Sequence, residues 1–378
     1  MAHHELFQLV KARIKAQGRL TFADYMATCL YEPGLGYYTS SGRKVGLEGD
    51  FYTSITVHAA FGRVIAREVA AAWQSLGSPT EFTVMEVGAG HGRLACDILD
   101  FLQEREPHCY KAIKLILVEK EPSLVTVQRQ LMQLHTDKLS WLTPAQLADF
   151  SFKGMVYSNE LLDAMPVHRV LMTESGLREI YVTCNGDELQ EQLDLPSTPA
   201  LAEYLARYGM PLMPGQEAEI SLAALSWFET MATVLTTGFI LTVDYGYGKE
   251  ELYSPHRKLG TLLCYYRHQI EDNPYIRLGE QDITSHINFS ALMEKGVELG
   301  MKTVWFGEQC RFLLAAGMVE EFEAVEAADI PEKEKLKKRL TLKRLIMPEG
   351  GMGDTFKVLL QSKGVEKPSF GCLKGFRI

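Results

Sequence analysis

Short apolar runs alternate with helix-like stretches through the first half of the chain. Residues 83–87 and 113–118 are apolar runs of strand length, and residues 91–106 between them are compatible with a helix. A weaker strand at 139–142 and a buried strand at 155–157 follow after further helical stretches. Strands that alternate with helices in this way predict an α/β fold around a mostly parallel sheet.

The rest of the chain is expected to surround that sheet. A fifth strand at 238–246 follows an insertion at about 166–222, which begins with a hairpin and is expected to cover the active edge. The late strands "MKTVWFGE" and "FKVLLQS" are expected to close one edge of the sheet. Residues 1–80 hold helical stretches around a Gly- and Tyr-rich loop, which we interpret as a lid, so the sheet domain spans 81–378.

Three glycines follow the first strand in "EVGAGHGRL". Gly88, Gly90 and Gly92 leave the backbone bare, so that a ligand can approach the N–H groups at the start of the next helix. A phosphate-binding loop needs Lys and then Ser or Thr after the last glycine, but Arg93 and Leu94 follow here. The G-x-G-x-G spacing also differs from the G-x-G-x-x-G of NAD and FAD proteins. A tight turn without a ligand is the alternative.

An acidic residue closes the second strand. Glu119 follows residues 113–118, where a carboxylate can accept hydrogen bonds from both hydroxyls of an adenosine ribose, although a solvated strand end is the simpler interpretation of this residue alone. Together with the glycine turn it favours S-adenosylmethionine over NAD as the cofactor. We expect the cofactor to be bound by Glu86, Gly88, Ala89, Gly90, Glu119, Asn159 and, from the Gly-rich loop, Asp50.

Further polar residues are predicted at the same edge. The strand at 155–157 leads into Asn159 and Glu160, and ligands of open α/β sheets bind at the carboxyl ends of strands. Glu160 is also a plausible first-turn residue of a helix "ELLDA", on which Asp163 would share its face. Asp244 ends the strand "ILTVD", with capping of the turn "YGYG" as the alternative. The candidate catalytic residues are Glu160, Asn159, Asp163 and Asp244.

Composition narrows the class of protein. The 378 residues are 46% hydrophobic and 23% charged, as in soluble globular enzymes, and the net charge of −9 argues against a nucleic-acid partner held through its phosphates. The seven cysteines form no C-x-x-C pair, which indicates reduced thiols and no metal site. With no run of 18 apolar residues and no signal peptide, we expect no membrane insertion and a bacterial cytoplasmic location in preference to the mitochondrial matrix.

Seven motifs in order resemble one known family over nearly the whole chain. They are "LYEPGLGYY", "GDFYTS" with "FGRVIA", "EVGAGHG", "SNELLDAMPVHR", "VDYGYG", "GTLLCYYRH" and "DITSHINF". The chain resembles the MidA family of S-adenosylmethionine-dependent methyltransferases, which includes the arginine methyltransferase of mitochondrial complex I assembly. The resemblance implies a class I methyltransferase fold, which is Rossmann-like, and methylation of an arginine on a protein of a respiratory complex.

The resemblance also implies roles for single residues. Gly88, Gly90 and Glu119 would hold S-adenosylmethionine, while Asn159 and Glu160 would face the transferred methyl group. If the acceptor is arginine, a carboxylate such as Glu160 can grip the charged guanidinium and localise its charge away from the attacking nitrogen.

The chain departs from the family pattern at two places. It reads "TSITV" where the family often reads "TSPEV", and it has Asn288 where an aspartate is common. Both segments are expected to face the substrate, so the departures bear on the acceptor more than on the cofactor.

Three other functions stay open at this point. An NAD-dependent oxidoreductase is disfavoured by the glycine spacing. A methyltransferase-like assembly chaperone that keeps S-adenosylmethionine as a structural ligand, and a methyltransferase for a small molecule, are compatible with the same motifs. The sequence indicates no oligomeric state.

Overall fold

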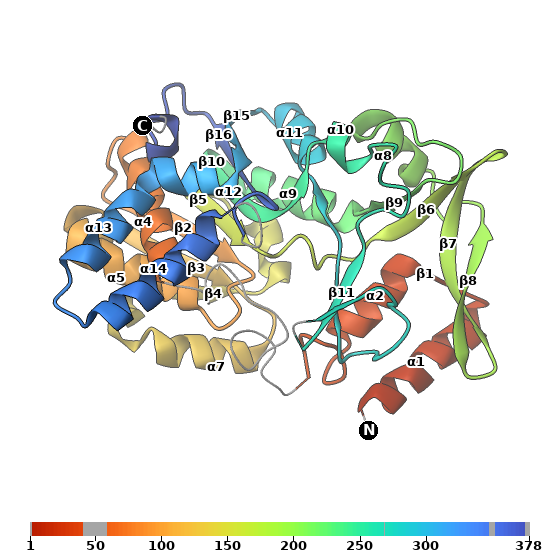
Figure 1. The fold of residues 1–378 in the computed structure, drawn as a ribbon. Helices are drawn as coiled ribbons and strands as arrows, with labels where there is room; N and C mark the ends of the chain where they lie inside the picture. The colour runs from red at the N-terminus through yellow and green to blue at the C-terminus, as the bar shows by residue number, and fades with distance from the viewer. Residues whose placement is uncertain (1, 41–58, 268, 348–351, 375–378) are drawn as a thin grey trace. The chain divides into compact units, whose positions relative to one another are not determined.

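The computed structural model describes residues 2–40, 59–267, 269–347 and 352–374 (Figure 1). The chain groups into two compact units, each formed from three separate segments. The sheet unit comprises Thr53–Leu161, Glu229–Asp244 and Lys295–Ile378. The hairpin unit comprises Met1–Tyr52, Leu162–Phe228 and Tyr245–Glu294.

One long sheet organises the sheet unit. Its strands lie in the order β15-β16-β10-β5-β2-β3-β4. The five strands from β10 to β4 are mutually parallel, and β15 is antiparallel to β16. The bounds are β2 (Phe82–Val87), β3 (Ile113–Val118), β4 (Leu139–Leu142), β5 (Phe152–Asn159), β10 (Leu235–Tyr247), β15 (Met301–Glu308) and β16 (Phe356–Lys363).

The chain order reverses in the middle of this sheet. From β2 the chain moves outward through β3 to β4, and it then returns to β5 on the opposite side of β2. Such a reversal opens a crevice beyond the carboxyl ends of the two central strands, where open α/β sheets bind their ligands. The space beyond β2 and β5 is therefore where a cofactor is expected.

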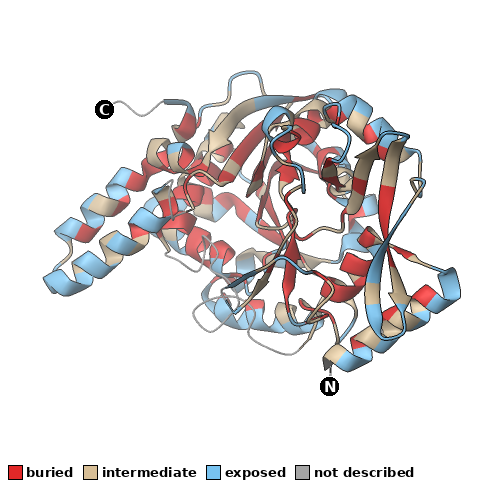
Figure 2. Cartoon of the chain, turned by 45° about the vertical axis from the view of Figure 1, so that its right-hand side comes forward, coloured by how far each residue is buried: buried red, intermediate tan, exposed pale blue. Residues whose placement is uncertain are grey.

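The central strands form because their apolar runs can be buried on both faces. In β3, "IKLILV", only Lys114 is exposed, and in β5 the exposed residue is Lys153. Figure 2 shows these strands mostly in the colour of buried residues. Continuous apolar runs are typical of parallel strands covered on both sides. The predicted strand at 155–157 proves longer, because the backbone ladder continues past Lys153.

Helices complete the sheet unit, and α4 and α5 pack against each other. One of the further helical stretches that the sequence indicates is α7, which ends at Leu131 and is followed by a 3-10 helix. The helical elements are α4 (Ala60–Ser75), α5 (Arg93–Arg105), α6 (Pro107–Ala112), α7 (Pro122–Leu131), η1 (Gln133–Lys138), η2 (Pro144–Asp149), α9 (Leu222–Val234), α12 (Gln309–Leu313), the π-helical η3 (Leu314–Met318), α13 (Val319–Ala327), α14 (Glu332–Ile346) and η4 (Gly371–Lys374); α9 begins in the hairpin unit.

The hairpin unit is mainly antiparallel. One sheet has the order β1-β7-β6-β9 with β8 paired to β7, and the predicted hairpin is present, with Thr173 opposite Gly176. A second sheet has the order β12-β11-β13, and β14 pairs in parallel with the last residues of β10. The bounds are β1 (Leu20–Thr21), β6 (His168–Thr173), β7 (Gly176–Asn185), β8 (Glu188–Asp194), β9 (Glu217–Ile220), β11 (Leu263–Tyr266), β12 (Gln269–Glu271), β13 (Asp282–Thr284) and β14 (Ile287–Asn288).

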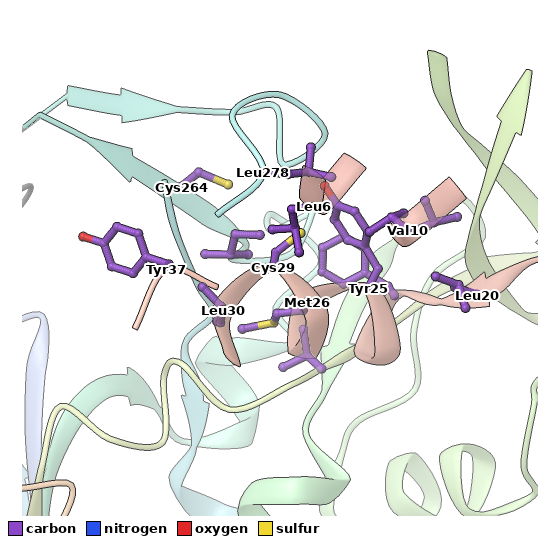
Figure 3. Close-up of a cluster of buried hydrophobic side chains, with 14 of the residues drawn as sticks. Leu6, Val10, Leu20, Tyr25, Met26, Cys29, Leu30, Tyr37, Cys264 and Leu278 are labelled. Carbon is purple, nitrogen blue, oxygen red and sulfur yellow. The ribbon is translucent and has the colours of Figure 1, made fainter. Parts of the chain in front are cut away.

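Helices supply much of the core of the hairpin unit. Figure 3 shows side chains of α1 and α2, such as Leu6, Val10 and Met26, packed with Cys264 and Leu278 from the later segment. The helices of this unit are α1 (Ala2–Gln17), α2 (Phe22–Tyr31), α8 (Ala200–Tyr208), α10 (Lys249–Leu252) and α11 (Phe289–Glu298), which runs on into the sheet unit. Among the described residues, none of the helices has the length and apolar character to span a membrane.

Candidate active site

Polar residues gather at the carboxyl ends of four adjacent strands in the sheet unit. Glu119 follows β3, Gly88 follows β2, Asn159 and Glu160 lie at the end of β5, and Asp244 lies on β10. Val87 is in register with Ser158, and Asn159 with Val243. The parallel register therefore brings these predicted residues to one edge of the sheet, on both sides of the crevice between β2 and β5.

The glycine turn requires backbone conformations that favour glycine. Gly88, Gly90 and Gly92 have φ of 78°, 51° and 83°, in the left-handed region. A Cβ at Gly88 would lie 2.7 Å from Leu161 Cδ1, so the Leu161 side chain would have to shift to admit it. Gly88 and Gly90 are exposed while Ala89 between them is buried, and Gly92 precedes α5. The turn thus offers bare main chain at the start of a helix.

Glu86 lies beneath this turn. Its side chain is only 2% exposed, and Tyr157 Oη donates a hydrogen bond of 2.8 Å to Glu86 Oε2. Burial raises the pKa of Glu86 to about 8, against the opposing effect of the Tyr157 hydroxyl. Because the two residues are in register on adjacent strands, the bond ties β2 to β5 below the crevice. Glu86 is therefore placed to position the turn.

Glu119 is held by hydrogen-bond donors from its own loop and from α7. The N–H groups of Lys120 and Glu121 each donate to Glu119 Oε1 at 2.9 Å, and Gln128 Nε2 lies 3.3 Å from Oε2. Burial raises the pKa of Glu119, and these three donors counter part of the rise. The carboxylate is half-buried. Its orientation is thus fixed at the end of β3.

Asn159 and Glu160 form a linked pair at the end of β5. Asn159 Nδ2 donates to Glu160 Oε1 at 3.0 Å, and the Glu160 N–H donates to the Val243 carbonyl at 3.0 Å. Glu160 has φ of 50°, which a residue with a side chain seldom adopts. Asn159 is 7% exposed, and its Oδ1 has no hydrogen-bond partner among the described residues.

The sequence suggests a helix at "ELLDA", and this prediction is wrong. Residues 160–165 form bends and turns, because Glu160 leaves the strand in the left-handed conformation. Asp163 therefore shares no helix face with Glu160. It belongs to the hairpin unit, where its Oδ1 accepts from the Ala164 N–H and its carbonyl accepts from the Ser285 N–H.

Asp244 lies within β10 and not at its end. The strand β10 continues to Tyr247, so Asp244 does not end it as predicted. Asp244 is fully buried, and its Oδ2 accepts a hydrogen bond of 3.2 Å from the Leu161 N–H. It thereby holds the segment directly after Glu160.

Of the two departures from the family pattern, the structure describes only the one at Asn288. Asp50 and residues 55–57 lie outside the described residues. Asn288 is buried in the hairpin unit, where its Nδ2 donates to the Tyr208 carbonyl at 2.9 Å and its Oδ1 accepts from the Ala291 N–H at 3.2 Å. An aspartate could not donate the first bond. The amide at this position thus serves the packing of α8 and α11.

Sequence reasoning missed two residues of this edge, Gln128 and Tyr157. Tyr157 could have been found, because side chains in register on neighbouring strands lie on one face of the sheet, and Glu86 is its neighbour. Gln128 has no such signal. Its side chain is completely buried in spite of its polarity, and only the tertiary structure reveals its contacts.

Comparisons with known proteins agree with this geometry. A family model described as "Putative S-adenosyl-L-methionine-dependent methyltransferase" matches residues 64–307. The Drosophila melanogaster protein named protein arginine methyltransferase NDUFAF7 homolog, mitochondrial, is 25% identical over 394 residues, covering 96% of this chain and 86% of that protein. The Rattus norvegicus NDUFAF7 is 27% identical over 307 residues, covering 74% of this chain and 67% of that protein.

A solved structure is similar over the entire chain. A COG1565 superfamily member from Burkholderia thailandensis, crystallised with S-adenosyl-homocysteine, has 30% sequence identity and a TM-score of 0.88, covering 100% of this chain and 96% of that chain. These findings confirm the predicted class I methyltransferase fold and S-adenosylmethionine as the cofactor. The glycine turn and the carboxylate after β3 fit that cofactor.

Proposed function

Because the chain belongs to the family of S-adenosyl-L-methionine-dependent methyltransferases whose model it matches, we propose that it transfers a methyl group from this cofactor to an arginine side chain of a protein. The relatives named protein arginine methyltransferase support the choice of acceptor, at 25% and 27% identity. By the same resemblance, the substrate protein is a subunit of a respiratory complex.

The cofactor half of the proposed site consists of the glycine turn and the end of β3. Main-chain groups of Gly88, Ala89 and Gly90 bind the cofactor, and Glu119 accepts hydrogen bonds from the ribose hydroxyls. S-adenosylmethionine supplies a methyl group on a positively charged sulfur. The chain's part in this half is to bind and orient, since a direct displacement needs no covalent intermediate with the protein.

The acceptor half consists of Asn159 and Glu160, and one observation carries the proposal. Glu160 is held with φ of 50° at the carboxyl end of β5, beside a buried Asn159 whose Oδ1 has no hydrogen-bond partner among the described residues. Such unfavourable conformations cluster at functional sites. A guanidinium carries five N–H donors in one plane, and the two side chains together offer the acceptors that it needs.

The transfer itself makes modest chemical demands on these residues. A guanidinium nitrogen forms the new bond to carbon, the carbon–sulfur bond breaks with its electron pair passing to sulfur, and the nitrogen loses one proton, which passes to water. Glu160 holds the other nitrogens and draws positive charge away from the attacking one. Asn159 fixes Glu160 Oε1 through its Nδ2 and orients the carboxylate. Alignment and charge placement supply the catalysis.

A labelling experiment tests the proposed function. The purified chain is incubated with S-adenosylmethionine labelled in its methyl group and with host proteins, and the labelled product is hydrolysed to amino acids. The expected result is label in methylated arginine. Label in another amino acid or in a small molecule would overturn the arginine assignment. Tight cofactor binding without transfer to any acceptor would favour the assembly chaperone.

A further inference from the structure

Gln128 on α7 connects three parts of the cofactor half. Its Nε2 donates to the Gly90 carbonyl at 2.8 Å and to Glu119 Oε2 at 3.3 Å. Its Oε1 accepts from Trp141 Nε1 at 2.8 Å. The side chain has no exposed surface. One amide thus joins the glycine turn, the end of β3 and the end of β4.

The chemistry of its partners fixes which way this amide faces. An indole N–H can only donate, so the atom that meets Trp141 must be the oxygen of Gln128. A main-chain carbonyl can only accept, so the atom that meets Gly90 must be the nitrogen. The amide therefore presents N–H groups to the turn and to Glu119, and Trp141 holds it in this orientation.

Glu119 has little accepting capacity left in this arrangement. A carboxylate has about four positions for hydrogen bonds, two on each oxygen. The Lys120 and Glu121 N–H groups occupy both positions on Oε1, and Gln128 occupies one on Oε2. One position then remains among the described contacts, yet a ribose brings two O–H donors. The Gln128–Glu119 contact, the longest of the three, is the one most easily exchanged.

A hydroxyl can resolve this conflict, because it donates and accepts at the same time. A ribose hydroxyl between Glu119 Oε2 and Gln128 Nε2 would donate to the carboxylate and accept from the amide. Gln128 would keep its bond to Gly90. We propose that Gln128 is a second ligand of the cofactor's ribose and, with Glu119, selects a ribose that carries both hydroxyls. This inference rests on the cofactor half of the proposed site.

Calorimetric titration with three ligands tests the proposal. The ligands are S-adenosylhomocysteine and its 2′-deoxy and 3′-deoxy analogues. With the wild-type chain, at least one deoxy analogue should bind about tenfold more weakly than the parent, the size expected for a hydrogen bond shared with a charged group. Gln128→Met keeps the length of the side chain and removes both polar atoms. In this variant the ratio between the affinity of the parent ligand and that of this analogue should fall to about threefold or less.

Equal weakening of all three ligands by Gln128→Met would overturn the proposal, because it would mean that Gln128 only braces the turn. Gln130→Met is the matched control, since Gln130 lies exposed on the same helix, and it should keep the wild-type affinities. If Gln128→Met does not fold, Gln128→Asn withdraws the donor by one methylene, and retention of the full affinity ratio in that variant would equally count against the proposal.

Glu119→Gln separates this inference from the cofactor assignment. If Glu119→Gln leaves the three affinities in their wild-type ratio, the ribose does not meet Glu119 and the cofactor half is wrong. If Glu119→Gln removes the preference but Gln128→Met preserves it, the cofactor half stands and only the role of Gln128 fails.

Discussion

The two halves of the proposed site hold their carboxylates in different ways. In the cofactor half, Glu119 has an extended strand before it and receives N–H donors from its own loop and from Gln128. In the acceptor half, Glu160 adopts a φ of 50°, and its neighbour Asn159 keeps a buried oxygen without a partner among the described residues. One carboxylate is nearly saturated with donors, and the other lies beside one buried amide oxygen without a partner among the described residues.

This difference matches the two kinds of ligand. A ribose diol is neutral and needs only a few acceptors in fixed positions, and the donors around Glu119 fix the orientation of its carboxylate. A guanidinium is charged and brings many donors, so a site for it should contain acceptors that are not satisfied within the protein. We infer that the residues at the ends of β2 and β3 bind the cofactor, while those at the ends of β5 and β10 position the methyl acceptor. Variants in the two halves should therefore affect cofactor affinity and transfer rate separately.

The largest effect is expected from Glu160→Gln. The amide has nearly the same shape but cannot balance the charge of a guanidinium, so the rate of methyl transfer should fall by roughly two orders of magnitude or more. Affinity for S-adenosylhomocysteine should stay within about twofold. Single-turnover kinetics and calorimetry measure the two quantities. Glu203→Gln, at an exposed position on α8, is the control. A native rate in Glu160→Gln would remove Glu160 from the mechanism.

Glu119→Ala should have the opposite profile. Loss of the ribose acceptor is expected to weaken cofactor binding by about 1 to 3 kcal/mol. At saturating cofactor the rate should change little, because no group at the reacting atoms is lost. Titration with S-adenosylhomocysteine provides the affinity. Unchanged affinity in a folded Glu119→Ala protein would place the ribose contact elsewhere.

Glu86→Gln should change how stability depends on pH. Burial raises the folded-state pKa of Glu86 to about 8 from a usual value of 4.5. Its protonated form therefore favours the fold at low pH, and this contribution is lost as the pH rises through 8. Between pH 5 and 8, the variant should gain free energy of unfolding relative to wild type by up to about 1.4 kcal/mol per pH unit.

Urea unfolding at several pH values measures this difference for Glu86. Glu366→Gln changes an exposed carboxylate in the same unit and should show no such trend. Parallel stability curves for wild type and Glu86→Gln would mean that the Glu86 carboxyl ionises normally in the fold.

The smallest effect concerns Asn288→Asp. An ionised aspartate cannot donate to the Tyr208 carbonyl, and it would place a charge against that oxygen. We expect a loss of about 1 kcal/mol in the free energy of unfolding, with cofactor affinity unchanged. The control Asn185→Asp lies at an exposed strand end. If Asn288→Asp altered turnover without altering stability, the acceptor half would have to include the hairpin unit.

The sequence predicts the central sheet well, because its strands are apolar runs between polar breaks. Residues 113–118 and 139–142 are found as β3 and β4 with the predicted bounds, and "MKTVWFGE" is β15. The short strands of the hairpin unit, such as β11 and β12, were not predicted. β11 has four residues and β12 has three, which is too short for a hydrophobic period to identify a strand.

At the candidate site, the sequence locates residues but not their conformations. Gly88, Glu119 and Glu160 could be assigned to strand ends, because parallel strands bring their carboxyl ends to one edge. The left-handed backbone of Glu160 could not be predicted, since "ELLDA" has good helical propensity and the hydrogen bond from Glu160 to Val243 is a tertiary contact. The same limit applies to Gln128, whose burial depends on Trp141 and Gly90.

The double variant Glu119→Ala/Glu160→Gln tests the division between the halves most directly. Affinity for S-adenosylhomocysteine and the single-turnover rate at saturating cofactor are measured for it and for both single variants. Independent sites give additive effects. If the two halves are independent, the double variant has the affinity of Glu119→Ala and the rate of Glu160→Gln. If Glu160→Gln alone weakened the cofactor as much as Glu119→Ala does, the two carboxylates would serve one ligand, and the division would be contradicted.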